Sequence, residues 1–391
     1  MFKKKNIVAV TGIRSEYDIL YPIIKVLQES GKFNVKLVVS GAHLSDWHGN
    51  TLEKIEEDGF EIVEKIDNLL MTNRKTQRVK GIGLLTYSLS QTVDREKPDF
   101  LLVVGDREES IATALVGNYM DVLTVHVAGG DPVYGNSDDP IRFAVSKLSH
   151  IHFTFAQEYA NNLIRMSEDE FRVHFVGNTS YYNIQHTPEI SMNELSSLVK
   201  CNLEKKKYLV FIKHPLSSEK EDSYEQMKIS LKALERFAIE NQIKVIGSYP
   251  NTDPGSYDIL KAIDEYSHSK WIKFYKTLPR TPFINLLRNA IALVGNSSMG
   301  ILEAPFYKLP VVNIGNRQRG RLNAGNVEFV DYNEEKIITA LQKACFDQSY
   351  REKIYNLSNP YGDEKAPEKI LNILLSIDLN DKKWYIKNNL C

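Results

Sequence analysis

Apolar residues gather in short runs along the chain, separated by longer stretches whose polar and apolar positions have a helical spacing. In the first half, the runs rich in Val, Ile and Leu are Ile7–Thr11, Val35–Ser40, Phe100–Val104, Leu123–Val127 and His152–Phe155. In the second half they are Tyr208–Ile212, Lys244–Gly247, Trp271–Phe274, Ile291–Gly295 and Val311–Ile314. Runs this short and this apolar predict strands that are buried on both faces of a sheet.

The stretches between these runs predict helices. The clearest are Glu16–Glu29, Glu108–Asn118, Asp139–Ser149, Glu219–Ile239 and Met299–Tyr307. Alternating strands and helices predict an α/β protein with doubly wound parallel sheets and right-handed crossovers. Because the polar segment Thr187–Lys207 separates the two series, we expect Rossmann-like domains over residues 1–186 and 187–391 that face each other across an active-site cleft. The polar tail after Asn380 is compatible with a frayed end or with packing back on the first domain.

Composition narrows the class of protein. The chain has 391 residues, 42% of them hydrophobic and 25% charged, which suits two globular domains. Its 49 Lys and Arg against 50 Asp and Glu give a formal net charge of −1, so no nucleic-acid partner is indicated. No apolar run approaches the ~18 residues of a membrane span, and the first run is too short for a secretory signal. Three scattered cysteines indicate neither disulfides nor a zinc site, so we expect a cytoplasmic protein.

The residues just after each strand are the candidates for chemistry, because ligands of open parallel sheets bind beyond the carboxyl ends of the strands. Gly12 and Arg14 follow the first run, where a glycine turn and a basic helix start suit an anionic group. Asp106 and Arg107 follow the third. A carboxylate beside an arginine at this place is either a catalytic acid or an ordinary helix cap, and both roles are compatible.

The stretch from His126 to Arg142 is the densest in the chain. It leaves a strand, runs through three glycines and two prolines, and enters a helix near Pro140. Its acidic residues are Asp131, Asp138 and Asp139. Acids crowded into a strand-end loop, with Asp106 expected nearby, favour acid–base catalysis over a solvated surface.

The second half supplies groups suited to a diphosphate. Lys213, His214 and Pro215 follow its first strand, and Gly295–Gly300 follows its fourth with Ser297 and Ser298. Backbone N–H groups and serine hydroxyls suit phosphate, and Glu303 could accept hydrogen bonds from ribose. Three arginines, Arg317, Arg319 and Arg321, could neutralise a leaving diphosphate. The pair His150 and His152 has no further ligand at metal spacing, so we expect neither a metal nor another cofactor.

Together these motifs resemble the hydrolysing UDP-N-acetylglucosamine 2-epimerases, a group that includes bacterial sialic and legionaminic acid pathway enzymes and the epimerase half of the animal bifunctional enzyme. The resemblance runs from about Ile7 to Asp378. The residues that carry it are Thr11–Glu16, Ser40–Ser45, Gly105–Arg107, His126–Arg142, Lys147–Phe153, Gly295–Ser298 and Asn316–Gln318.

The resemblance implies a GT-B fold, with UDP held mainly by the second domain, and a homodimer or homotetramer. It implies hydrolysis of UDP-N-acetylglucosamine to UDP and N-acetylmannosamine without NAD or a catalytic metal. The diphosphate or leaving-group contacts it implies are Arg14, His214, Ser297, Ser298 and Arg317, with Glu303 on the ribose. The catalytic residues it implies are Asp106, Asp131, Asp138, Asp139 and His214, with Arg107, Arg142 and His43 in the sugar site.

Two positions depart from the family pattern. Asp131 stands where members commonly have Glu, and Phe143 stands where they have His. These departures bear on the identity of the hexose more than on the reaction class. The alternatives are, in order, a hydrolysing UDP- or GDP-N,N′-diacetylbacillosamine 2-epimerase, a non-hydrolysing UDP-N-acetylglucosamine 2-epimerase, and a GT-B glycosyltransferase or nucleotide-sugar sensor.

The expected mechanism is anti elimination of UDP followed by hydration of the resulting glycal. Asp131 or Asp106 would remove the C2 proton while the bond from C1 to UDP breaks, and Asp138 or Asp139 would assist the addition of water.

Overall fold

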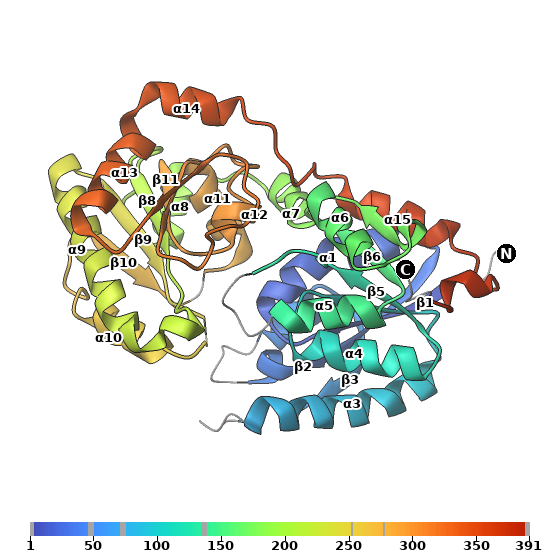
Figure 1. Ribbon diagram of the computed structural model, residues 1–391. Coiled ribbons are helices and arrows are strands. Elements are labelled where there is room, and N and C mark those ends of the chain that lie inside the picture. The colour runs from blue at the N-terminus through green and yellow to red at the C-terminus, as the bar shows by residue number, and fades with distance from the viewer. Residues whose placement is uncertain are drawn as a thin grey trace. The chain divides into compact units, whose positions relative to one another are not determined.

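A computed structural model describes residues 4–45, 51–70, 76–133, 139–251, 253–276 and 278–387. Its fold contains two parallel sheets (Figure 1). Contacts between Cα atoms divide the chain into two compact units. Unit 1 holds the described residues of 1–131, 138–183 and 361–391, and unit 2 those of 132–137 and 184–360. The predicted α/β class with two doubly wound sheets is confirmed.

Unit 1 is built on a seven-stranded sheet of order β3-β2-β1-β4-β5-β6-β7, in which every pair is parallel. Its strands are β1 (Lys5–Thr11), β2 (Phe33–Ser40), β3 (Glu61–Ile66), β4 (Phe100–Val104), β5 (Leu123–Val127), β6 (Ile151–Thr154) and β7 (Val173–Phe175). Its α-helices are α1 (Arg14–Glu29), α2 (Leu52–Glu57), α3 (Thr76–Glu96), α4 (Glu108–Tyr119), α5 (Asp139–Leu148), α6 (Gln157–Arg165) and α15 (Ala366–Ser376). Short 3₁₀ turns are η1 (Gly41–Leu44), η3 (Glu170–Arg172) and η5 (Lys382–Trp384).

Unit 2 repeats the plan with a six-stranded parallel sheet of order β10-β9-β8-β11-β12-β13. Its strands are β8 (Tyr208–Ile212), β9 (Lys244–Ser248), β10 (Ile272–Tyr275), β11 (Ala292–Gly295), β12 (Val311–Ile314) and β13 (Val327–Val330). Its helices are α8 (Met192–Leu198), η4 (Ser217–Asp222), α9 (Ser223–Asn241), α10 (Ser256–Asp264), α11 (Arg280–Asn289), α12 (Met299–Leu302), α13 (Glu334–Phe346) and α14 (Gln348–Tyr355). Helix α7 (Ser180–His186) spans the point where the chain passes from unit 1 to unit 2.

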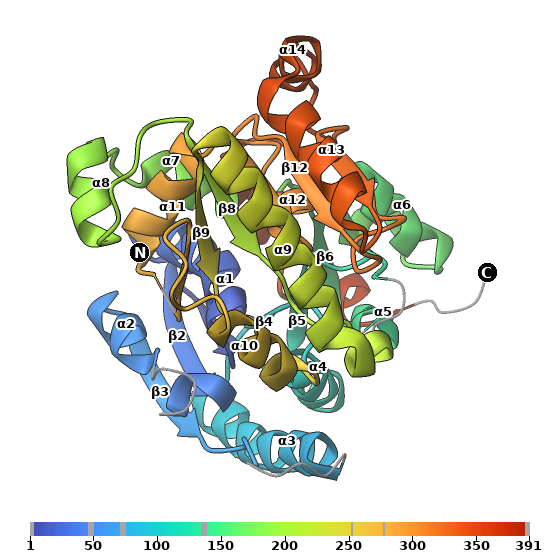
Figure 2. The same ribbon diagram turned by 90° about the vertical axis from the view of Figure 1, so that its left-hand side faces the viewer.

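Helices cover both faces of each sheet. In unit 1, α3, α4 and α5 pack side by side on one face, and α1 packs with α15 (Figure 1). In unit 2, α9 lies across the sheet between α10 and α13 (Figure 2), and α8 and α11 contact each other within a second apolar cluster. Strands β4, β5, β8 and β11 are buried along their whole length, as a sheet sandwiched between helices requires.

The domain limits differ from the predicted 1–186 and 187–391 at the C-terminus. The chain enters unit 2 after Asn183 and returns to unit 1 at Tyr361. The reason for the return is α15, whose apolar residues Ile370 and Leu374 are buried while the helix packs against α1.

The hydrophobic pattern did not predict several elements, or predicted them with other bounds. β3, β7 and β13 are edge or near-edge strands with partly exposed residues, so their apolar runs are weak. α3 buries only a narrow stripe. The predicted helix Met299–Tyr307 ends at Leu302, and the one predicted from Glu219 begins at Ser223 after a 3₁₀ turn. In the described part of the chain, no helix is both long and apolar enough to cross a membrane.

Candidate active site

The strand order of each sheet reverses at one place. In unit 1 β1 lies beside β4, and in unit 2 β8 lies beside β11, while the loops after each pair lead in opposite directions. Open parallel sheets bind ligands at such reversals. We call the turns after β1, β2, β4 and β5 the first edge, and the turns after β8, β11 and β12 the second edge.

An ion pair between Asp106 and Arg142 is the central feature of the first edge. Asp106 follows β4, and its Oδ2 accepts a hydrogen bond from Nη2 of Arg142 on α5. Nη1 of Arg142 donates to the Ala128 carbonyl oxygen at 2.8 Å. The side chains are 18% and 10% exposed, so the pair is largely withdrawn from water yet open on one side. A buried guanidinium thus ties the β4 and β5 turns to the same helix.

His126 lies at the root of the loop after β5 and is a neutral support. Its Nε2 is 2.7 Å from the Gly105 carbonyl oxygen, and its Nδ1 is 3.0 Å from Oγ of Ser146 on α5. Burial lowers the pKa of His126 to about 3, so its imidazole stays uncharged at neutral pH. The loop continues through Ala128, whose φ of 64° is unusual for a residue with a side chain. The bonds from His126 and Arg142 hold this turn in place.

The acids of the loop have different surroundings. Asp131 is buried, with 4% of its surface exposed. Asp139 is half-buried and is the first residue of α5, so it is separated from Arg142 by less than one helical turn. Asp138 lies outside the described residues. The structure therefore brings Asp106, Arg142 and the Ala128 turn into one cluster, with Asp131 and Asp139 at the two ends of the same loop.

Other predicted residues of unit 1 occupy the neighbouring turns. Arg14 opens α1 and lies 3.5 Å from Asp18, while Arg107 precedes α4. His43, expected in the sugar site, is fully buried: its Nε2 is 3.0 Å from Oγ1 of Thr11 and its Nδ1 is 2.5 Å from Oγ1 of Thr51. Burial also lowers its pKa to about 4. Since both ring nitrogens are engaged inside the unit, His43 supports the first edge, and its expected contact with the sugar stays a prediction.

Asn296 organises the second edge. Its Oδ1 accepts from the His214 N–H at 2.7 Å, and its Nδ2 donates to the His214 carbonyl oxygen at 2.8 Å. Its own carbonyl oxygen accepts from Nη1 of Arg317 at 3.2 Å and from Nε2 of Gln318 at 3.0 Å. One buried amide residue therefore ties the turns after β8, β11 and β12 together.

His214 is held as a neutral hydrogen-bond donor. Its Nδ1 accepts from the Asn251 N–H at 3.0 Å, which leaves the proton on Nε2. Burial, and then the charges of Arg317 and Lys213, lower the pKa of His214 to about 3. An uncharged imidazole N–H can still donate to a phosphate oxygen.

The turn after β11 carries Ser297, Ser298 and Glu303. Oγ of Ser297 accepts from the Met299 N–H at 3.3 Å, and Ser298 occupies the N-cap position of α12 without a side-chain capping hydrogen bond. All three residues are half-buried and face partly to water. Because α12 spans only Met299–Leu302, its dipole is smaller than the predicted longer helix would provide.

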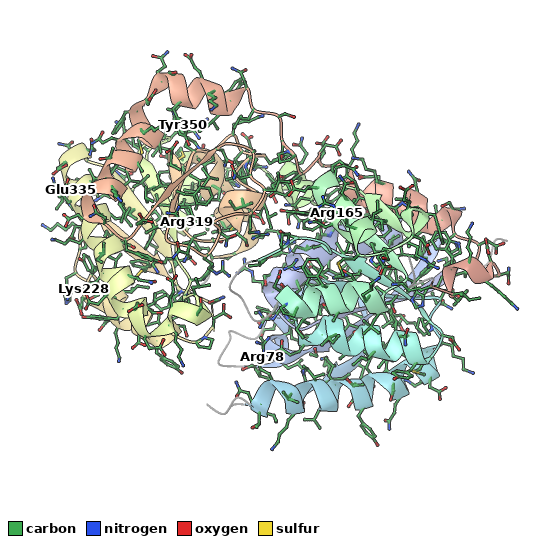
Figure 3. The ribbon with its side chains drawn as sticks, viewed as in Figure 1. Arg78, Arg165, Lys228, Arg319, Glu335 and Tyr350 are labelled. Carbon is green, nitrogen blue, oxygen red and sulfur yellow. The ribbon has the colours of Figure 1, made fainter. Side chains whose placement is uncertain are left out.

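The arginines after β12 do not act as one cluster. Arg317 donates to the Asn296 carbonyl oxygen, and Arg321 donates to the Gln318 side chain at 2.7 Å. Arg319, which is labelled in Figure 3, pairs with Asp331 at 2.7 Å. Arg317 is linked to the strand-order reversal by its direct hydrogen bond to Asn296. Among the described residues, no group of three or more His, Cys, Asp or Glu could hold a metal ion.

Sequence reasoning did not single out two buried acids next to these sites, and it named a third buried ionisable group, Lys213, only together with His214 and Pro215. Glu16 and Glu109 lie in the first turns of α1 and α4, and Lys213 follows β8. Helix phase was the available signal for the acids: Glu16 shares the face of Leu20 and Leu27, and Glu109 that of Thr113.

Comparison with known proteins finds a family that matches this chain. The sequence profile described as UDP-N-acetylglucosamine 2-epimerase matches residues 25–375. The chain is 32% identical over 378 residues to the UDP-N,N′-diacetylbacillosamine 2-epimerase (hydrolyzing) of Legionella pneumophila, covering 97% of both chains. It is 30% identical over 349 residues to the GDP/UDP-N,N′-diacetylbacillosamine 2-epimerase (hydrolyzing) of Campylobacter jejuni, covering 88% of this chain and 90% of that one.

Among solved structures, UDP-GlcNAc 2-epimerase from Neisseria meningitidis, bound to UDP-GlcNAc, superposes with a TM-score of 0.81. Sequence identity is 21%, and the match covers 95% of this chain and all of that one. This likeness confirms the predicted GT-B fold.

Proposed function

Because the chain belongs to the UDP-N-acetylglucosamine 2-epimerase family, we propose that it is a hydrolysing 2-epimerase that converts a UDP-linked 2-acetamido sugar to UDP and the free 2-epimer. The observation that carries the proposal is the Asp106–Arg142 pair, joined through the Ala128 turn to the loop of the buried Asp131. Carboxylates fixed in a mostly dry strand-end site suit removal of a proton from carbon.

The first step is elimination across C1 and C2 of the sugar. We assign Asp131 or Asp106 as the base that takes the C2 proton, while the C1–O bond breaks and its electron pair leaves with UDP. The C2 proton is weakly acidic, so departure of the diphosphate has to lead and C1 acquires oxocarbenium character. Carboxylates on the first edge would stabilise that positive charge.

The leaving group needs donors aimed at the diphosphate. We assign this role to the residues around Asn296 on the second edge, which are His214, Ser297, Ser298 and Arg317. We further assign Glu303 to the ribose and Arg14 as an additional cation for the diphosphate. A neutral imidazole N–H and hydroxyl groups can strengthen their hydrogen bonds as charge develops on the phosphate.

The second step is hydration of the 2-acetamidoglucal. Water adds its hydroxyl to C1 and a proton enters C2 from the face that gives the manno configuration. Asp139, or Asp138, would assist this addition, and Arg107 and Arg142 would hold the sugar. The sum of both steps consumes one water and releases UDP and a reducing sugar.

Two substrates deserve direct comparison. UDP-N-acetylglucosamine is the substrate that the name of the family implies. The relatives at 32% and 30% identity are named for N,N′-diacetylbacillosamine, which favours a sugar with a second acetamido group as the other candidate. Asp131 in place of the usual Glu is one methylene shorter and would leave room for a displaced or larger hexose.

The test is incubation of the protein with UDP- and GDP-linked forms of both sugars in D₂O. We expect release of nucleoside diphosphate and a reducing sugar that carries deuterium at C2, identified by NMR. Return of an intact epimerised nucleotide sugar would indicate the non-hydrolysing reaction. A product without deuterium at C2 would rule out the elimination pathway.

A further inference from the structure

Two buried carboxyl groups lie directly beneath the first edge, and the proposed mechanism leaves them without a role. Glu16 is 6% exposed and Glu109 is 5% exposed. Both belong to the first turn of a helix that begins just after a strand of the reversal, α1 after β1 and α4 after β4. Buried acids of this kind need either a cation or a proton.

Both carboxyl groups lie against Gly12. Oε2 of Glu16 accepts from the Gly12 N–H at 3.1 Å. A Cβ atom placed on Gly12 would lie 1.8 Å from Oε1 of Glu109, so a larger residue here would displace the Glu109 side chain. Gly41, whose φ is +57°, is similarly close: a Cβ there would be 2.8 Å from the same oxygen and 2.9 Å from the Gly12 carbonyl oxygen.

The hydrogen-bond donors around the two acids are too few for two charges. Oε1 of Glu16 and Oε2 of Glu109 are buried and have no hydrogen-bond donor among the described residues. Ser40 offers only a long 3.5 Å contact to Oε1 of Glu109. The adjacent Glu108 differs, because it pairs with Arg78 of α3, which is labelled in Figure 3.

Charged groups of both signs act on the two acids. Arg107 favours ionisation of both acids, whereas Asp106 opposes it at Glu16 and Glu108 opposes it at Glu109. Burial is the largest influence and raises the pKa of each, followed by the charge of Glu109 for Glu16 and that of Glu108 for Glu109. Two neighbouring carboxylates in a dry site cannot both ionise without a large penalty.

We propose that Glu16 and Glu109 share one proton and act as a positioning pair that fixes the Gly12, Gly41 and Arg107 turns of the first edge. These turns carry Arg14, the His43 support and the Asp106–Arg107 dipeptide. Because the His43 N–H also donates to the Gly12 carbonyl oxygen at 3.2 Å, movement of Gly12 would reach both neighbouring turns. The pair acts through backbone position and does not contact substrate, and only its kinetic consequences rest on the proposed function.

Proton release on unfolding tests the pair independently of activity. At pH 7 the unfolded chain ionises both acids, so unfolding of the wild-type protein should release about one more proton than unfolding of the double variant Glu16→Gln/Glu109→Gln. The fall in stability as pH rises from 5 to 8 should be shallower in the double variant. The control is Glu29→Gln, an exposed acid at the other end of α1, which should behave as wild type. Equal proton release by wild type and double variant would overturn the proposal.

A second measurement covers the outcome in which the double variant does not fold. The folded wild-type protein should show an infrared band of a protonated carboxyl group at pH 7, and the single Glu109→Gln variant should lose it or shift it. Absence of the band from the wild type contradicts the shared proton whatever the variants do.

Kinetic measurements then distinguish a positioning role of Glu109 from the effect of removing the volume of its side chain. Glu109→Ala should lower kcat by about tenfold or more, with the affinity for UDP within about twofold because we assign the diphosphate to the second edge. Glu109→Gln, which keeps the shape and a hydrogen atom to share, should recover most of kcat. Equal impairment by Ala and Gln would mean that an ionised carboxylate is needed and would refute the proposal. If the wild type turns over no nucleotide sugar, the proposed function fails while the proton measurements still judge the pair.

Discussion

The two edges share a strand order and a reversal, yet they bury opposite ionisable groups. The first edge buries Glu16 and Glu109 and ties its turns with the Asp106–Arg142 pair. The second edge buries Lys213 and ties its turns with the neutral side chain of Asn296. In the proposed reaction, positive charge develops on the sugar and negative charge on the diphosphate. The contrast teaches that one fold, used twice, carries buried ionisable groups of opposite sign beside the same reversal of strand order.

The comparison also explains why histidines should not govern the pH response. Burial lowers the pKa of His126 and His214 to about 3 and that of His43 to about 4. All three are neutral above pH 5, so proton-linked effects near neutrality should come from the buried acids of the first edge and from Lys213 of the second.

Asp106→Asn should break the first edge with the largest effect. Loss of the carboxylate removes a candidate base and breaks the ion pair of the buried Arg142 guanidinium with Asp106. We expect kcat to fall by about a thousandfold and the free energy of unfolding to fall by about 2 kcal/mol. Steady-state kinetics and urea unfolding measure the two.

The matched control is Asp121→Asn, an exposed residue in the turn before β5 with φ of 55°, a conformation that Asn adopts readily. It should leave both quantities unchanged. If Asp106→Asn kept activity within tenfold of wild type, the catalytic assignment of the first edge would fail.

Lys213→Met should sharpen the comparison at the second edge. Nζ of Lys213 is buried, has no hydrogen-bond partner among the described residues, and lies 5.0 Å from the centre of the Tyr332 ring. Burial lowers its pKa to about 7, below the unfolded value of 10.5. The folded state therefore carries the full penalty below pH 7 and recovers it as pH rises toward 10.5.

We expect Lys213→Met to raise the free energy of unfolding by about 3 kcal/mol at pH 7 and by progressively less toward pH 10. The pair Glu16 and Glu109 has the opposite sign, since its stabilising proton is lost as pH rises. Unfolding curves from pH 6 to 10 give the comparison, with Lys232→Met on the exposed face of α9 as control. A variant less stable than wild type at pH 7 would show that Lys213 has a partner when the protein is in solution.

Asn296→Ala should loosen the second edge without changing charge. It deletes the two hydrogen bonds to the His214 backbone, at 2.7 and 2.8 Å, and leaves those groups unsatisfied. We expect UDP affinity, measured by calorimetry, to fall by about 30-fold, equivalent to about 2 kcal/mol. The exposed Asn356→Ala is the control. Wild-type affinity in Asn296→Ala would show that the hub does not position the diphosphate donors.

Sequence alone could predict most of the fold, because buried parallel strands are continuous apolar runs. β4, β5, β8 and β11 were predicted within a residue of their bounds, and the strand-end rule placed Asp106 and His214 at the reversals. The sequence could not predict which charged side chains pair with one another. Whether Arg142 meets Asp106 depends on how α5 crosses the β4 turn, which is a matter of tertiary packing and not of spacing.

The fate of neighbouring acids shows the same limit. Glu108 and Glu109 both suit the first turn of a helix, where carboxylates complement the helix dipole. One is paired with Arg78 and the other is buried beneath Gly12. Helix phase indicates which one points inward, but the absence of a cation beside it becomes visible only when β1, β2 and β4 are assembled. The burial of His43 against Thr11 and Thr51 likewise has no local sequence signal.

The smallest effect should come from Lys387→Met. Lys387 follows η5 and contacts the C-terminal end of α5, which is remote from Asp139. Nζ of Lys387 donates to the carbonyl oxygens of Lys147 and Ser149 at 2.7 and 2.6 Å and lies 2.7 Å from the buried Glu168. Glu168 keeps Lys147 and His152 as partners, both at 3.1 Å, so the charge stays matched. We expect a loss of about 1 kcal/mol in unfolding free energy with kcat and UDP affinity within about twofold of wild type. The exposed Lys382→Met, in η5, is the control. If Lys387→Met lowered kcat as far as Asp106→Asn does, the catalytic effects would not be confined to the edges, because the cap on α5 would then set the position of Arg142.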